Sequence, residues 1–210
     1  MDQDDIEKLY AKPAFTLIEY GYYFMLPEVL LAEINSTKIE PKNISAKVYF
    51  ILQYGYFKAR HLFSKIDYKN SQEDVDFIVS HYFPEHASSN KLPTRKVQRQ
   101  TKTKLLKHFE FSDNRKSIEK IIEEKVTYLA KTTAHLTLIF DGVLSELEQK
   151  KCVLPAYSKM QDLLGAALKK EDRRLSKTTK EALKNHTRVH AIKCQLPLPM
   201  TTTSFADLSY

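Results

Sequence analysis

Glycine is the residue type that most constrains this chain, because it is nearly absent. The 210 residues include only four glycines, and Gly21, Gly55, Gly142 and Gly165 all lie within stretches of helical pattern. Hairpin turns and phosphate-binding loops both depend on glycine, so the sequence argues against a hairpin-rich β fold and against a glycine-rich nucleotide-binding loop. Because 42% of the residues are hydrophobic, the chain can still bury a substantial core. We therefore predict an all-α protein.

Apolar residues recur at three- and four-residue steps along most of the chain, which is the pattern of amphipathic helices. The longest apolar stripe contains Gly55, where we expect close contact between two helices, because glycine costs a helix about 1 kcal/mol relative to alanine. Thr16 and Glu19 have the spacing of a capping box, and Ser158 and Gln161 have it again. These two pairs predict helices that begin at Thr16 and at Ser158.

The charged residues are unevenly distributed along the chain. Residues 1–40 carry eight acidic and three basic residues, whereas residues 91–116 carry nine basic and two acidic residues. A second basic segment, residues 149–180, has nine basic and three acidic residues. An acidic start followed by two basic segments predicts a molecule with one positive face, although solvated lysine-rich helices would give the same composition.

A linker between Glu85 and Lys91 separates the acidic part from the basic part, and it contains Ser88-Ser89-Asn90. The helical period fades near His186, and the prolines that follow exclude helix there. We predict two small helical domains, of which the second is helix-turn-helix-like, and an irregular tail. The predicted bounds are 1–87 for the N-terminal helical domain, 88–185 for the basic DNA-binding domain and 186–210 for the tail.

Several functional classes find no support in the composition. Cys152 and Cys194 are too few for a secreted disulfide scaffold, and no apolar run approaches the roughly 18 residues that span a bilayer. The acidic start is unlike a secretory signal, so we expect a cytoplasmic protein without membrane association. His186, His190 and Cys194 have the helical spacing of metal ligands but lack a fourth ligand. No Walker loop or Ser-His-Asp arrangement is present, and we expect no cofactor.

The segment around Pro155 carries the most specific functional pattern. An extended run meets the proline, a turn follows, and Tyr157, Ser158, Lys159 and Gln161 then lie in the first turn of a helix. Side chains in this position read base edges in the major groove, where glutamine pairs with adenine and lysine with guanine. A tyrosine hydroxyl can contact phosphate. The other interpretation is an ordinary capped helix at the surface.

Basic side chains cover several faces of a predicted helix that opens at Pro93, so this helix must be largely exposed. We expect Lys58 and Arg60 of an earlier helix to add further phosphate contacts. Contact with about six phosphates would give a slope of log affinity against log salt near −5. A solubilising surface is the alternative. The predicted phosphate-binding residues of the helix are Arg95, Lys96, Arg99, Lys102 and Lys104.

Aromatic residues precede Lys58 and Arg60 in the earlier predicted helix. Tyr54, Tyr56 and Phe57 beside Lys58 and Arg60 could form a stacking platform for single-stranded nucleic acid or RNA. Aromatic residues at helical spacing belong more often to a core, and we favour the core for Tyr54 and Phe57. An RNA-binding helical protein therefore stays an alternative to a duplex-binding one.

Three motifs carry a resemblance to a known family. They are, in order, Phe15-Thr16-x-x-Glu19 followed by Phe24-x-Leu26, the run from Tyr49 to Arg60, and Leu154-Pro155-Ala156-Tyr157-Ser158-x-x-Gln161-Asp162-Leu163-Leu164 with Glu171-x-x-Arg174-Leu175. Their order and spacing resemble the N-terminal region of replicative transposases of the Tn-three family, over residues 10–180. In that family the region is helical and binds the terminal inverted repeats of the transposon.

The resemblance implies sequence-directed binding of double-stranded DNA at transposon ends, as one part of transposition. It implies no catalytic activity for this chain, because the catalytic domain of these transposases lies far downstream. Thr187 to Tyr210 departs from the family pattern, which predicts a truncated or frameshifted gene. The alternative from another class is a helical protein-interaction module that uses the acidic N-terminal helices.

Overall fold

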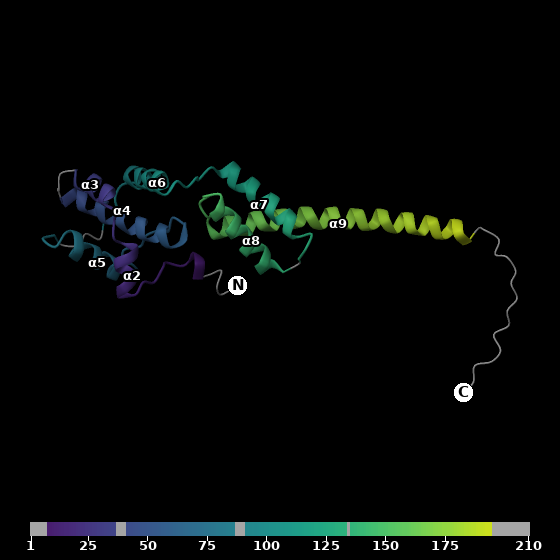
Figure 1. Cartoon of the computed structure of the whole chain (residues 1–210), viewed down its shortest axis with the longest axis horizontal. Coiled ribbons are helices and arrows are strands. Elements are labelled where there is room, and N and C mark those ends of the chain that lie inside the picture. The colour runs from purple at the N-terminus through teal and green to yellow at the C-terminus, as the bar shows by residue number, and fades with distance from the viewer. Residues whose placement is uncertain (1–7, 37–40, 87–90, 134, 195–210) are drawn as a thin grey trace, which may run out of the picture. The chain divides into compact units, whose positions relative to one another are not determined.

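The computed structural model describes residues 8–36, 41–86, 91–133 and 135–194, and all regular elements in this part of the chain are helices (Figure 1). The prediction of an all-α fold is confirmed. None of these helices is both long and apolar enough to cross a membrane. In chain order they are α2 (Leu17–Tyr23), α3 (Glu28–Asn35), α4 (Pro41–Arg60), α5 (Gln72–Tyr82), α6 (Arg95–Phe109), α7 (Arg115–Leu129), α8 (Leu136–Gln149) and α9 (Tyr157–Cys194).

The two predicted capping boxes have different outcomes. At the start of α2, the Glu19 carboxylate accepts a hydrogen bond from the Thr16 N–H at 2.8 Å, and the Thr16 hydroxyl accepts from the Glu19 N–H at 3.4 Å. The box predicted at Ser158 is wrong. Helix α9 begins one residue earlier, and its first backbone bond runs from the Met160 N–H to the Ala156 carbonyl at 2.9 Å. Ser158 therefore lies inside the first turn.

Helix α4 forms the centre of the first hydrophobic core, and α2, α5 and α6 pack against it. The close contact predicted at Gly55 is confirmed, because a Cβ atom at this position would lie 2.4 Å from the ring of Phe24. Tyr54, Tyr56 and Phe57 are all at most 3% exposed. The core interpretation is thus correct for these rings, and they are not available to stack on bases.

A buried acid ties the N-terminal segment to this core. Asp74 of α5 is 1% exposed and accepts a hydrogen bond from the Lys12 ammonium at 2.7 Å. The Tyr56 hydroxyl donates to the same Asp74 oxygen. Burial, and secondly this hydrogen bond, raise the pKa of Tyr56 far above its usual range. A buried carboxylate needs such partners, so Lys12 and Tyr56 make the position of Asp74 tolerable.

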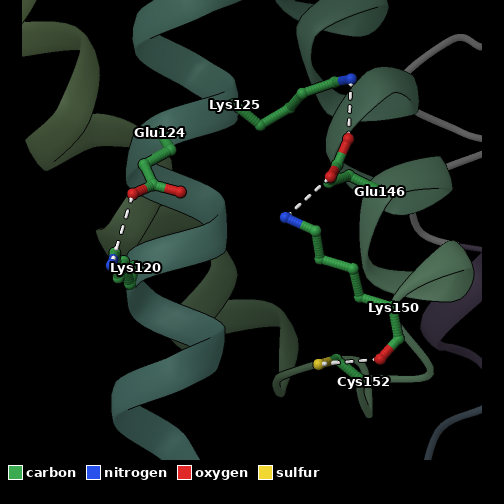
Figure 2. Close-up of polar contacts among 6 residues, drawn as sticks. All are labelled: Lys120, Glu124, Lys125, Glu146, Lys150 and Cys152. Carbon is green, nitrogen blue, oxygen red and sulfur yellow. Dashed lines mark hydrogen bonds and ion pairs between the residues drawn. The ribbon is translucent and has the colours of Figure 1, made fainter.

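The second core lies between α7, α8 and the start of α9, with Ile122, Val126, Val143, Leu147 and Met160 fully buried. Figure 2 shows how ion pairs join its elements at the surface. The Glu146 carboxylate of α8 is 2.9 Å from the ammonium of Lys125, on α7, and 2.9 Å from that of Lys150. One carboxylate thus pairs with two lysines, which leaves this group with one positive charge in excess.

The two cores do not divide where the sequence predicts a domain boundary, near residues 85–92. Leu105 of α6 is fully buried in the first core, and α6 packs on α4. The division between the cores therefore follows α6 instead of preceding it. The physical reason is that the basic composition of α6 belongs to its exposed face, whereas the side chains of Thr101 and Leu105 face the first core. The charge composition of a helix thus indicates the character of its exposed face, and it does not predict which core the helix packs against.

By its contacts the chain forms two compact units, residues 1–168 and residues 169–210. The first unit contains both hydrophobic cores. In the second unit, the Arg174 guanidinium donates a bidentate pair of hydrogen bonds to Glu171, with its Nε 2.8 Å from Oε2 and its Nη2 2.5 Å from Oε1. The described side chains beyond Glu171, residues 172–184, are all exposed, and Leu175 and Leu183 are among them.

The predicted irregular tail begins too early. Helix α9 extends to Cys194, past residue 186, at which the helical pattern was expected to end. Residues 195–210, the rest of the predicted tail, lie outside the described residues. Loss of the apolar period therefore does not mark the end of the helix, because the helical backbone continues without it.

Candidate nucleic-acid interface

Helix α6 presents its basic side chains on the face away from the first core. Arg95, Lys96 and Arg99 are exposed, and within the described part of the chain none of them forms an ion pair. The helix ends at Glu110, which adopts a left-handed conformation with φ of 60°. The Phe111 N–H then donates to the Leu106 carbonyl at 2.9 Å, which closes the last turn. The three free cations therefore stand on a well-terminated helix.

The other two predicted cations of α6 have acidic partners. The Lys102 ammonium lies 2.8 Å from a carboxylate oxygen of Asp113, and the Lys104 ammonium lies 2.5 Å from one of Glu33. All four side chains are between 43% and 53% exposed. Exposed ion pairs contribute about 0–1 kcal/mol, so a phosphate can displace either acid at low cost. Both lysines are compensated in the free protein.

Lys58 and Arg60 are used inside the protein. The Lys58 ammonium donates to the Tyr22 carbonyl at 2.7 Å and lies 3.7 Å from the centre of the Tyr22 ring. The Arg60 guanidinium donates to the Lys8 carbonyl. Burial lowers the pKa of both side chains from the ordinary values. Their head groups hold α2 and the N-terminal segment in place, which competes with the predicted phosphate contacts.

The first turn of α9 is exposed on one side. Ser158, Gln161 and Asp162 are exposed, whereas Met160 is fully buried in the second core. The buried methionine anchors the turn and leaves the hydroxyl, amide and carboxylate pointing away from the core. This outward side carries donors and acceptors of the kind that read base edges.

Two other side chains of this turn are engaged within the protein. The Tyr157 ring packs against Tyr10, with 5.2 Å between ring centres. Burial is the main cause that raises the pKa of Tyr10, and the nearby Tyr157 is the second. The Lys159 ammonium lies 3.2 Å from Glu119, which also pairs with Arg115 at 2.8 Å. Lys159 therefore shares its carboxylate with Arg115, whereas Lys102 and Lys104 each pair with a separate one.

Backbone hydrogen bonds fix the approach to α9, here called the lead-in segment (residues 150–156). The Ser112 N–H donates to the Lys151 carbonyl at 2.8 Å, and the Val153 N–H donates back to the Ser112 carbonyl at 2.9 Å. On its other edge, the Leu154 N–H donates to the His61 carbonyl at 3.2 Å. The sequence gives no signal for these bonds, because they involve only main-chain atoms. They attach the start of α9 to the connections that follow α4 and α6.

A surface cavity of about 410 Å³ lies beside the lead-in segment. Lys102 of α6 and Lys159 of α9 both line it, so the structure brings one predicted phosphate contact and one predicted base contact to the same place. Asp113 and Glu119 line it as well. Arg115 lines the cavity too, so its charged lining is three basic and two acidic side chains, a net charge of +1.

A family model described as Domain of unknown function (DUF4158) matches residues 1–167. The chain belongs to this family. The comparisons with curated proteins and with solved structures gave no match. The region matched by the DUF4158 model contains both cores, all of α6 and the first turns of α9, so it includes each candidate contact named above.

Metal chemistry finds no site in the described part of this DUF4158 chain. No group of three or more His, Cys, Asp or Glu side chains among the described residues could hold a metal ion. The side chains of His186, His190 and Cys194 lie outside the described residues. Cys152 is a buried free thiol, and burial raises its pKa, so it is not poised as a nucleophile.

Proposed function

We propose that this chain binds double-stranded DNA in a sequence-directed way at the inverted-repeat ends of a transposon. The observation that carries the proposal is the exposed group of Arg95, Lys96 and Arg99 on α6, which has no acidic partner among the described residues. The family of the chain supports it, because DUF4158 domains are associated with transposases of the Tn-three family. The motif resemblance points in the same direction.

Helix α6 supplies the backbone contacts in this proposal. If each of the three unpaired cations contacts one phosphate, the slope of log affinity against log salt should be near −3. If Lys102 and Lys104 also exchange their acidic partners for phosphates, the slope should be about −5. Lys58 and Arg60 contribute through the fold in this proposal, because Lys58 holds α2 and Arg60 holds the N-terminal segment.

Helix α9 supplies the base contacts. The Gln161 amide can pair with adenine, the Ser158 hydroxyl with several bases, and the Asp162 carboxylate can accept from cytosine. Helices α8 and α9 would form the helix-turn-helix-like unit, with residues 150–156 between them. This connection is longer than the roughly three to four residues of the usual motif. The proposal includes no chemical step and no cofactor.

Binding to the inverted repeats that flank the gene tests the proposal, in comparison with a scrambled duplex of the same length. We expect Gln161→Ala to weaken binding to the repeat and to leave the scrambled duplex unaffected. Arg99→Gln should weaken both and reduce the salt slope by about 1. Lys107→Gln is a matched charge control on the same helix. Equal effects of Gln161→Ala and Arg99→Gln on both duplexes would contradict the assigned roles.

An exposed apolar group on α2 and α3 favours the protein-interaction module as a second candidate. Leu17, Ile18 and Val29 are 84%, 88% and 78% exposed. Single apolar residues at a surface are normal, whereas a contiguous exposed apolar patch marks an interaction site. Absence of retardation of any duplex at moderate salt would favour this candidate over DNA binding. Stronger binding to single-stranded RNA than to duplex DNA would favour the RNA-binding alternative.

A further inference from the structure

A second pocket, between α4, α6 and the connection after α4, concentrates positive charge. It has a volume of about 390 Å³, which lies within the usual range of about 300–1,000 Å³ for ligand sites. Four basic side chains line it, and none of its lining residues is acidic. They are Lys65, Arg95, Arg99 and Lys102.

Three of these cations are unpaired in the described part of the chain. Lys65, Arg95 and Arg99 are exposed and form no ion pair there, whereas Lys102 is held by Asp113. Like charges that line one concave surface repel each other and raise the local potential, so an anion is attracted and relieves the repulsion. Two arginines also offer planar forks that match the oxygens of a phosphate.

The floor of the pocket is polar and fixed. Gln53 is 3% exposed, and its Nε2 donates to the Ser64 carbonyl at 2.7 Å and to the Tyr49 hydroxyl at 3.3 Å. Its buried Oε1 accepts no hydrogen bond within the described residues. A buried acceptor without a donor is unusual in a folded protein, so Gln53 is an unsatisfied polar group in the lining of this pocket. The half-buried Phe63 adds an aromatic wall.

We propose that this pocket binds one phosphate group carried by a nucleotide. Lys65, Arg95 and Arg99 hold the phosphate oxygens, and the polar floor around Gln53 faces the attached sugar or base. The meaning of the site for a DNA-binding protein rests on the proposed function, but the pocket itself can be tested without a duplex. It gives Lys65 a role that no sequence pattern assigns.

The test is titration of the whole chain with inorganic phosphate, thymidine 5′-monophosphate, a thymidine dinucleotide with one internal phosphodiester, and thymidine, followed by amide chemical shifts. We expect the three phosphate-bearing probes to shift amides around Ser64 and Arg99, and thymidine to shift none. Preference for the monophosphate would identify a free or terminal nucleotide, and binding of the dinucleotide an internal phosphate of a strand. No shift with any phosphate-bearing probe would overturn the proposal.

Lys65→Gln is the decisive variant, because Lys65 has no part in the proposed duplex contacts. Loss of one charge-assisted contact should weaken phosphate binding by about tenfold. Lys107→Gln removes the same charge from α6 outside the pocket and should change it little. Equal weakening by both variants would show a diffuse electrostatic effect and overturn the proposal. If the protein retards a duplex but Lys65→Gln does not change phosphate binding, the DNA-binding proposal is retained and the pocket proposal is overturned.

Discussion

At the scale of single residues, glycine sets the distance between α2 and α4. The ring of Phe24 occupies the space that a side chain at Gly55 would need. Gly165 of α9 is the opposite case, since a Cβ atom there would meet nothing within 4 Å. The two positions have the same helical propensity and differ only in packing.

We expect Gly55→Ala to lower the free energy of unfolding by up to about 2 kcal/mol, because overpacking costs about 1–3 kcal/mol and the gain in helix propensity offsets about 1 kcal/mol. Gly165→Ala should instead raise it by up to about 1 kcal/mol. Urea denaturation monitored by circular dichroism measures both. A stabilising effect at Gly55 would show that the contact with Phe24 is looser than the structure has it.

Glu146 makes stability depend on pH. Hydrogen bonds from Lys150 and then Lys125 hold the pKa of this carboxyl below its ordinary value of 4.5. A depressed pKa means that the stabilisation is present above the unfolded value and is lost as pH falls through the folded value. We expect Glu146→Gln to cost less than about 1 kcal/mol at neutral pH and nothing in strong acid.

Denaturation of both proteins at neutral pH and near pH 3 checks this expectation. Glu85→Gln is the matched control, because Glu85 is exposed and forms no ion pair among the described residues. A difference between the wild type and Glu146→Gln that persists in acid would contradict the assignment to ion pairs.

At the scale of elements, the helices could be predicted from the sequence, but their partners could not. Apolar period is a local property, so it located most helices and the tight contact at Gly55. Lys104 and Glu33 are 71 residues apart, and only the folded chain shows that one compensates the other. The same holds for the backbone bonds of the lead-in segment. The predicted site therefore contained three unpaired cations of α6, Arg95, Lys96 and Arg99, but could not separate them from the paired Lys102 and Lys104.

One substitution can remove the acidic partner of a lysine on α6. Asp113→Asn removes the carboxylate that holds Lys102. We expect this variant to bind any duplex several-fold more tightly, with a salt slope steeper by up to about 0.9. Glu73→Gln, on exposed α5 surface, changes the net charge equally without releasing a cation of α6. Gel retardation over a series of salt concentrations compares them, and equal effects would indicate that only net charge matters.

At the scale of the whole first unit, main-chain bonds connect the elements that carry the two kinds of proposed contact. Ser112 follows α6, Val153 precedes α9, and each bonds to the other's segment. Helices α6 and α9 should therefore move together when the protein meets its target. We expect the Val153 and Leu154 amides to exchange slowly in hydrogen-exchange measurements, as bonded amides next to a buried core do. Fast exchange of both would show that the connection opens readily.

If α6 and α9 move together, the distance between the phosphate contacts and the base contacts on the DNA is fixed. Adding one base pair between the part of the site touched through phosphates and the part read through bases shifts them by about 3.4 Å and rotates them by roughly 35°, given about 10 base pairs per turn. A flexible tether would absorb that change. With the insertion, this protein would bind the site more weakly although every original base pair is still present. Its specificity would therefore depend on the spacing of the two parts of the site as well as on their base sequence.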